Sequence, residues 1–152
     1  MAFTIVERIS GSLTSGRDAL KPIESQFGRL LPDDYADFLR TYNGGRPKPS
    51  VFTFKPRDGK ATESRVQCFF GCCDDADYGL LHVISTYRDR ICDEFCPIAC
   101  DAFGNLLLLS LRKHDHGSVW FWDHERESPD TPTMDNMEIV AASFIEFIEN
   151  LR

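Results

Sequence analysis

Apolar side chains recur at helical spacing in residues 31–49, whose sequence is LPDDYADFLRTYNGGRPKP. Four of them, Tyr35, Phe38, Leu39 and Tyr42, follow the i, i+3, i+4, i+7 pattern and therefore share one face of a helix. The spacing predicts an amphipathic helix whose apolar face must be covered by a sheet or by another helix.

Turn and charge signals mark both ends of this predicted helix. Pro32 suits the first helical position, where its missing N–H is not needed. Asp33 and Asp34 follow in the first turn, where carboxylates interact favourably with the helix dipole. At the other end, the tripeptide Asn-Gly-Gly at 43–45 can supply the left-handed residue that ends a helix, and prolines soon follow.

The same periodicity predicts further helices elsewhere in the chain. Side chains that can cap a helix, or glycines that can end it, stand near their boundaries. The last helix has the capping-box form, a serine followed three residues later by a glutamate. These helices are predicted at 3–13, at 18–28, at 80–91 with Asp77 as its cap, and at 143–151 with Ser143 as its cap.

Shorter runs of β-branched, aromatic or alternating apolar residues predict strands. The run LLLLSL at 106–111 is apolar almost throughout, which is typical of a central strand covered on both faces. Pro97 is expected at the first position of a strand or in an edge strand, and residues 123–133 are expected to form a long polar loop. Strands are predicted at 51–54, 64–70, 97–100, 106–111 and 119–122, with short connections that favour antiparallel pairing in an α+β fold.

Length and composition agree with a single domain that spans residues 1–152. The chain is 42% hydrophobic, and a chain of this length can bury a core without disulfides. No run approaches the roughly 18 apolar residues of a membrane span, so none is expected. The N-terminus lacks a basic region followed by an apolar run, so we expect no secretory signal and a cytoplasmic location. The six cysteines are then expected to be reduced thiols.

The charge of the chain is acidic and unevenly distributed. The formal net charge is −7, and residues 77–152 carry 14 acidic and 6 basic side chains, whereas residues 1–76 carry 10 and 11. A protein that binds nucleic acid needs a basic face, so the charge argues against that class. It is compatible with a basic protein partner, or with solubility alone.

Cysteine and histidine spacing gives only weak signals for a metal site. Cys92, Cys96 and Cys100 are evenly spaced, but the last two would lie about 13 Å apart on one face of a strand, too far for one ion. His114 and His116 could chelate a metal, yet no third ligand is signalled. We favour packing for the cysteines and a solvated turn for the histidines, and we expect no metal or other cofactor.

Motifs for catalysis are missing from the sequence. It contains no G-x-S-x-G, P-loop or G-x-G-x-x-G pattern. Neighbouring carboxylates occur at 74–75 and at 125 and 127, but in polar loops with no apolar pocket to raise a pKa. We therefore do not expect an enzyme. Trp120 and Trp122 share one face of a strand and are interpreted as core under a helix, with a partly exposed tryptophan at an interface as the alternative.

Three segments of the chain share residues, order and spacing with one protein family. They are the amphipathic helix and its end at 31–47, the strand–turn–strand and aromatic strand at 97–125, and the final helix at 140–151. In these segments the chain resembles the SUKH superfamily, whose namesake members are the yeast Smi/Knr cell-wall regulators. The residues of the first signature are Leu31, Pro32, Tyr35, Phe38, Leu39, Asn43, Gly44 and Gly45.

The resemblance implies an α+β fold in which a mostly antiparallel sheet is flanked by helices. It also implies a binding protein rather than an enzyme. Bacterial members commonly act as immunity proteins that bind and neutralise a toxin, often a nuclease, whereas the fungal members serve as regulatory scaffolds. A short chain without long disordered arms favours the immunity function. The scaffold function is the alternative, and a small enzyme or a metal-binding protein that uses Cys and His is less favoured.

Two acidic clusters are the candidate binding residues for such a partner. Toxin nucleases carry basic clefts for phosphate, so acidic loops could occupy the cleft and speed association. Neither a nucleic acid nor a membrane is expected as a partner. The candidates are Asp74, Asp75, Asp77 and Tyr78 in the first cluster and Asp123, Glu125 and Glu127 in the second.

The signature around the first helix is expected to be architectural. Its cover is predicted to be the strands at 106–122 together with the final helix at 144–151. The tripeptide at 43–45 would fix how the chain leaves the helix, while the acidic loops would select the partner.

Overall fold

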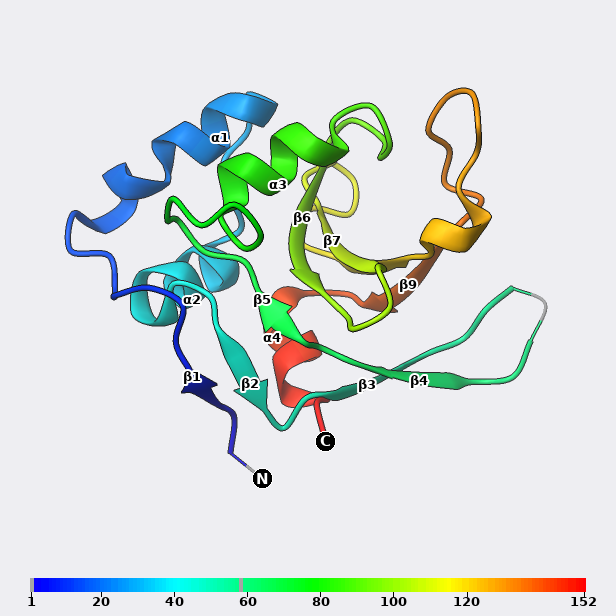
Figure 1. Cartoon of the computed structure of the whole chain (residues 1–152), viewed down its shortest axis with the longest axis horizontal. Helices are drawn as coiled ribbons and strands as arrows, with labels where there is room; N and C mark the ends of the chain where they lie inside the picture. The colour runs from blue at the N-terminus through cyan, green and yellow to red at the C-terminus, as the bar shows by residue number, and fades with distance from the viewer. Residues whose placement is uncertain (1, 58) are drawn as a thin grey trace.

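The computed structural model, which describes residues 2–57 and 59–152, contains a five-stranded antiparallel sheet with helices on both faces (Figure 1). The strand order is β5-β6-β7-β8-β9, and two smaller antiparallel pairs, β1–β2 and β3–β4, lie beside it. This arrangement confirms the predicted α+β fold. The elements are β1 (Thr4–Glu7), the 3₁₀ helix η1 (Gly16–Leu20), α1 (Lys21–Phe27), α2 (Asp33–Tyr42), β2 (Arg46–Lys48), β3 (Val51–Phe54), β4 (Thr62–Arg65), β5 (Cys68–Phe69), α3 (Leu80–Tyr87), β6 (Phe95–Cys100), β7 (Leu106–Ser110), β8 (Val119–Trp122), the 3₁₀ helix η2 (His124–Arg126), β9 (Met137–Ala141) and α4 (Phe144–Glu149).

Strand β7 lies at the centre of the sheet, as its sequence predicts. All of its residues are buried, which a strand covered on both faces requires. Its pairing with β8 places Leu107 opposite Phe121 and Leu106 opposite Trp122. Because successive residues of a strand point to opposite faces, Phe121 and Trp122 mark the two sides of the sheet.

Helices α2 and α4 and strand β3 cover the Phe121 side. The ring of Phe38 in α2 lies 4.9 Å from that of Phe69 and 5.1 Å from that of Phe144 in α4, measured between centroids. On the same side, the ring of Phe52 in β3 lies 6.0 Å from that of Phe121. The apolar face of α2, the helix predicted in residues 31–49, is therefore covered by the sheet and by α4.

Helix α3 covers the Trp122 side, and α1 lies next to α3 (Figure 1). The ring of Tyr87 in α3 meets that of Trp122 edge-on, with centroids 5.7 Å apart, and Trp122 is fully buried. Trp120 is only half-buried, and its Nε1–H donates to Ser118 Oγ at 2.9 Å. The core interpretation is confirmed for Trp122, while Trp120 keeps part of its surface exposed.

The ends of α2 and α4 follow their sequence signals closely. Pro32 is the N-cap residue of α2, so the helix begins one residue later than predicted, and Asn43 ends it in the left-handed conformation with φ 52°. Gly44 follows with φ 84°, and a Cβ at this position would lie 2.7 Å from the Phe69 carbonyl oxygen, so only glycine fits. In α4, Ser143 Oγ accepts a hydrogen bond from the Glu146 N–H at 3.1 Å, which confirms the predicted cap.

Residues 3–13 do not form the predicted helix. Thr4–Glu7 is instead strand β1, which pairs with β2. Phe3 and Ile5 are half-buried and alternate with exposed residues, so the true period here is two. Phe3 reaches Tyr42 of α2 with ring centroids 5.8 Å apart, a tertiary contact that the local pattern does not reveal.

Several predicted strand boundaries also need correction. The predicted strand at 64–70 is divided between β4 and β5, which belong to different sheets. Pro97 lies inside β6, which is paired on both sides, so its predicted place at an edge or first position is wrong. An irregular register between Pro97 and Ala99 accommodates the missing N–H. The predicted loop at 123–133 contains η2, and the sequence does not predict edge strand β9.

Helix α3 ends at Tyr87, earlier than predicted, and its N-cap residue is Gly79 rather than Asp77. The prediction of Asp77 as the cap is wrong because the backbone N–H of Asp77 is itself bound by Asp75 Oδ1, at 2.8 Å. The Asp77 residue is thus part of a turn that precedes the helix. Within the described residues, no helix has the length and apolar character needed to cross a membrane.

Candidate protein-binding surface

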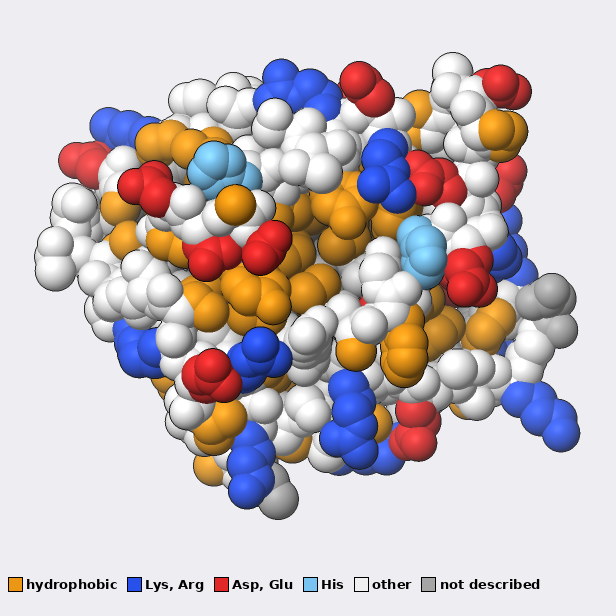
Figure 2. Space-filling view, viewed as in Figure 1, with side chains coloured by type: hydrophobic (Ala, Val, Ile, Leu, Met, Phe, Trp, Pro, Cys, Tyr) orange, Lys and Arg blue, Asp and Glu red, His pale blue; other side chains and the backbone are white. Residues whose placement is uncertain are grey.

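The first acidic cluster lies in a loop, residues 72–79, that joins β5 to α3. Asp74, Asp75 and Asp77 are exposed, and Tyr78 is half-buried. Figure 2 shows acidic side chains gathered on the viewed face at the place where Figure 1 draws this loop, next to α3. We call this segment the 72–79 loop.

Uncharged groups hold the neck of the 72–79 loop. The Gly71 N–H donates to the Tyr78 carbonyl at 3.0 Å, and the Leu80 N–H donates to the Gly71 carbonyl at 2.8 Å. The buried side chain of Asn43 adds two bonds, because Oδ1 accepts from the Cys72 N–H at 2.7 Å and Nδ2 donates to the Cys72 carbonyl at 3.2 Å. The signature residue Asn43 therefore anchors the acidic loop directly, a role that sequence reasoning missed.

The three carboxylates of the 72–79 loop differ in what they do. Asp75 Oδ1 accepts from the N–H groups of Asp77 and Tyr78, both at 2.8 Å, so it shapes the loop. The carboxylates of Asp74 and Asp77 have no hydrogen bond or ion pair among residues 2–57 and 59–152. Partial burial raises the pKa of Tyr78, which keeps its hydroxyl protonated and able to donate. Asp74 and Asp77 thus leave two negative charges uncompensated at the surface.

The second acidic cluster, which we call the 123–127 loop, contains η2. Asp123 Oδ1 caps η2 by accepting from the Glu125 N–H at 3.0 Å, and its Oδ2 pairs with Arg126 Nε at 3.1 Å. Arg126 also pairs with the buried carboxylate of Glu138, at 3.2 Å. Asp123 is therefore structural, and it shares the charge of Arg126 with Glu138.

Glu127 is neutralised by a residue far from it in sequence. Its two carboxylate oxygens accept from Arg90 Nε and Nη2, both at 2.9 Å. The Arg90 guanidinium also lies over the rings of Tyr87 and Trp122, 4.7 and 5.5 Å from their centroids. Hydrogen bonding from Arg90 lowers the pKa of Glu127. Of the second cluster, only Glu125 is exposed and without an ion pair in the described part of the chain.

A hydrogen-bond network fixes the 123–127 loop against the turn between β6 and β7. Asp101 is almost fully buried, and its Oδ1 accepts from the N–H groups of Phe103 and Asn105, at 2.8 and 2.9 Å. Asn105 Oδ1 is 3.1 Å from the backbone N of His124 and 2.7 Å from its ring Nδ1. The motifs at 101–105 and 123–125 are visible in the sequence, but their mutual contact is not.

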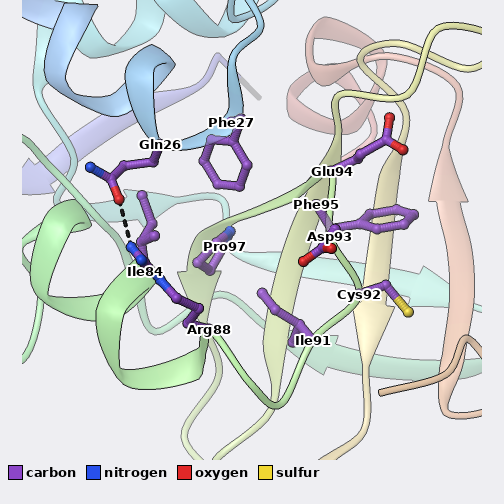
Figure 3. A pocket seen from close by; sticks show the side chains of 10 residues that line it. All are labelled: Gln26, Phe27, Ile84, Arg88, Ile91, Cys92, Asp93, Glu94, Phe95 and Pro97. Carbon is purple, nitrogen blue, oxygen red and sulfur yellow. Dashed lines mark hydrogen bonds between the residues drawn. The ribbon is translucent and has the colours of Figure 1, made fainter. Parts of the chain in front are cut away.

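The cavity shown in Figure 3 has a volume of about 370 Å³ and lies between α1, α3 and the start of β6. Gln26 Oε1 accepts from Arg88 at 2.6 Å on one side of it. Cys92 borders the cavity, but burial raises the pKa of its thiol, and no histidine lines the space. The residues that line the cavity therefore include no cysteine–histidine pair. Its lining residues are Gln26, Phe27, Ile84, Arg88, Ile91, Cys92, Asp93, Glu94, Phe95 and Pro97.

The cysteines and histidines do not converge. All six cysteines are free, and burial raises the pKa of Cys68 to about 12, so its thiol stays protonated. His116 Nε2 lies 2.9 Å from the Leu30 carbonyl oxygen, while His114 is exposed. In the part of the chain that the structure describes, no three His, Cys, Asp or Glu side chains are placed to hold a metal ion.

Asp115, between the two histidines, organises the β7–β8 connection. Its carboxylate accepts from Ser110 Oγ at 2.6 Å and Ser118 Oγ at 3.1 Å, and it pairs with Arg112. Partial burial alone would raise the pKa of Asp115, but the bonds from Arg112 and the two serines outweigh it and lower the pKa to about 2. His114 and His116 are exposed, as the predicted solvated turn requires, and the ionised Asp115 between them fixes the turn.

Comparison with known proteins places this fold in a family. The model of the SMI1 / KNR4 family (SUKH-1) matches residues 16–150. The chain is also similar to the SPbeta prophage-derived uncharacterized protein YokK of Bacillus subtilis (strain 168), with 32% identity over 174 aligned positions that cover 99% of this chain and 86% of the relative. The resemblance seen in the sequence is therefore confirmed, and the chain belongs to the SMI1 / KNR4 (SUKH-1) family.

Proposed function

We propose that this protein is a non-enzymatic, cytoplasmic immunity protein that binds and neutralises a cognate bacterial toxin domain. The observation that carries the proposal is the 72–79 loop, which presents the uncompensated carboxylates of Asp74 and Asp77 on a frame held by Asn43 and the Gly71 backbone. Membership of the SUKH family supports it, because bacterial members commonly have this function. A relative carried by a prophage accords with it.

The physical basis is complementarity of charge. A toxin that acts on nucleic acid carries a basic surface for phosphate. Fixed carboxylates on the inhibitor attract such a surface over distance and raise the association rate, and a frame that is already ordered loses little entropy on binding. The partner contacts are therefore assigned to Asp74, Asp77 and Tyr78, with Glu125 as a contribution from the 123–127 loop.

Asp75, Asp123 and Glu127, also candidates from the sequence, receive a different role in this proposal. The carboxylate of each residue makes contacts within the chain, either with backbone N–H groups or with an arginine. A carboxylate already paired with an arginine attracts a basic partner less strongly. We assign these three residues to holding the loops in shape.

Rescue of a toxin-producing cell tests the proposal. A toxin domain, which we expect to be encoded beside this protein's gene, is co-expressed with the wild-type chain, with the double variant Asp74→Lys/Asp77→Lys, or with the control Asp130→Lys/Glu149→Lys. The control makes the same change in net charge at exposed residues that are distant from the 72–79 loop in sequence. We expect the wild type and the control to restore growth and the loop variant to fail.

Two other outcomes would change the assignment. Absence of rescue and of binding by the wild-type chain would refute the immunity function, and modest binding to several cellular proteins would then favour the regulatory scaffold. Full rescue by Asp74→Lys/Asp77→Lys would retain the immunity function but remove the 72–79 loop from the interface.

A further inference from the structure

A second hollow is lined by residues of the β3–β4 hairpin, the β6–β7 turn and η2. Figure 1 draws the hairpin on the right. The volume of the hollow is about 350 Å³. The rings of Phe54 and Phe121 form an apolar part of its lining and stack with centroids 4.2 Å apart. Phe103, at the tip of the β6–β7 turn, stands at its border with 76% of its surface exposed. We call this hollow the Phe103 groove.

The turn that presents Phe103 is held rigidly. Its own N–H is bound by Asp101 Oδ1, and Asp101 Oδ2 lies 2.9 Å from Asn105 Nδ2 and 3.3 Å from Ser64 Oγ of β4. Gly104 sits against the His124 ring. One buried carboxylate thus links the hairpin to the turn, and Asn105 links the turn to η2. An apolar side chain that is exposed on a fixed turn is arranged for contact at little further entropic cost.

The Asp and Glu side chains that line the Phe103 groove are not accompanied by a basic lysine or arginine in the lining. The lining includes four such carboxylates. Glu63 is paired with Arg152 and Asp123 with Arg126. Both carboxylate oxygens of Asp101 accept hydrogen bonds within the chain. Glu125 is exposed and without an ion pair within residues 2–57 and 59–152. The exposed ring of Phe103 beside the unpaired carboxylate of Glu125 suits an apolar side chain that is flanked by lysine or arginine.

We propose that the Phe103 groove is the apolar anchor site for the toxin, and that it receives a hydrophobic side chain of a basic toxin loop. This inference rests on the proposed immunity function and adds a second contact to the 72–79 loop. In this division of labour the 72–79 loop accelerates the encounter through charge, and the groove slows dissociation by burying apolar surface around Phe103.

Binding to the purified, catalytically inactivated toxin domain encoded beside the gene tests this assignment. The wild-type chain is compared with Phe103→Ser, with Glu125→Lys and with the control Leu30→Ser, which alters another exposed apolar residue away from the groove. We expect Phe103→Ser to weaken affinity about 10-fold or more through faster dissociation, with an unchanged dependence on salt. Glu125→Lys should weaken affinity and flatten that dependence, and Leu30→Ser should match the wild type.

The outcomes separate this inference from the proposed function. Binding by the wild type with the same affinity for Phe103→Ser would overturn the groove assignment and leave the immunity function intact. A wild-type chain that does not bind the toxin would overturn both. Sedimentation could instead show that the wild-type chain is a dimer and that Phe103→Ser is a monomer. The occupant of the groove would then be a second copy of this chain and not the toxin. Thermal unfolding serves as the folding check, because Phe103 is exposed and its replacement should leave stability unchanged.

Discussion

The 72–79 loop and the 123–127 loop look alike in sequence and differ in the structure. Each contributes three carboxylates to the candidate surface. The neck of the first is held by backbone groups and the amide of Asn43, and Asp74 and Asp77 keep their charges unbalanced. The second is held by charges, because Arg126 and Arg90 pair with Asp123 and Glu127. An acidic sequence therefore gives an acidic surface only where the fold supplies no arginine.

The largest effect is expected from removing the neutral anchor of the 72–79 loop. Asn43→Gly keeps the left-handed backbone but leaves the Cys72 N–H, the Cys72 carbonyl and the Gly11 carbonyl without their partner. We expect a loss of about 2 to 3 kcal/mol in the free energy of unfolding, since buried polar groups lose their bonds. Urea denaturation measures the loss, and amide hydrogen exchange should show faster exchange at Cys72.

The matched control for that change is Gln26→Ala. It also removes a side-chain amide, but this amide is exposed and, among the described residues, makes a single hydrogen bond, with Arg88 at the surface. Its expected effect is within about 0.5 kcal/mol. Equal stability losses in Asn43→Gly and Gln26→Ala would show that Asn43 does not anchor the loop.

Acid should loosen the 123–127 loop before the neck of the 72–79 loop, because uncharged groups hold that neck. The pKa of Glu127 is lowered in the folded chain by Arg90, so its contribution to stability is present above the pKa of the unfolded chain and is lost as the pH falls through the folded pKa. The pKa of Asp115 is also lowered, to about 2, so its contribution to stability has the same pH dependence and is lost last as the pH falls.

Hydrogen exchange between about pH 5 and pH 2 would test this order. After correction for the intrinsic rate, protection should fall first around residues 123–127 and then at the β7–β8 connection. Protection that falls first at the neck of the 72–79 loop would contradict the assignment of neutral and charged anchors.

A smaller loss of stability is expected from Glu127→Gln. The variant keeps the shape of the side chain but removes the charge that pairs with Arg90, while the stacking of Arg90 over Tyr87 and Trp122 remains. Since the pair is partly exposed, we expect about 1 kcal/mol, and less at high salt. Thermal unfolding at low and high salt measures both. A loss that is independent of salt would mean that packing, rather than charge, holds this loop.

The smallest effect on stability is expected from Asp74→Asn/Asp77→Asn. Neither carboxylate has a partner among the described residues, so stability should stay within about 0.5 kcal/mol of the wild type. A slight gain is the favoured direction, because the chain is acidic and the two charges repel its other carboxylates. A clear loss, measured by urea denaturation, would reveal structural contacts that the folded chain does not show.

Local signals in the sequence predict the framework of the fold. The helices around Phe38 and Phe144 and the strand at 106–110 are found because periodicity and boundary residues agree over many positions. Strand β1 is not found because its four residues lie in a segment whose spacing also fits a helix, and β9 is not found because a buried glutamate, Glu138, interrupts its apolar pattern. Pro97 also shows the limit of local signals. The rule that keeps proline out of the interior of a central strand fails here, because a register irregularity in β6 accommodates it.

The candidate site is predictable only in part, for a similar reason. The sequence identifies both acidic clusters, but the partners of Glu127 and Asp123 decide which carboxylates remain unbalanced. Arg90 lies 37 residues from Glu127 along the chain, so no local pattern joins them. The turn around Phe103 is visible in the sequence, but the exposure of its ring and its place beside Phe54 depend on the tertiary structure.

The central claim is that the unbalanced charges of the 72–79 loop recruit the toxin, and the salt dependence of the association rate tests it most directly. The rate is measured between the inactivated toxin domain and the wild-type chain, Asp74→Lys/Asp77→Lys or Asp130→Lys/Glu149→Lys. For the loop variant we expect association about 10-fold slower or more at low salt and a flatter decline as salt rises, with the control close to the wild type. Equal rates and slopes for the loop variant and the wild type would contradict the claim.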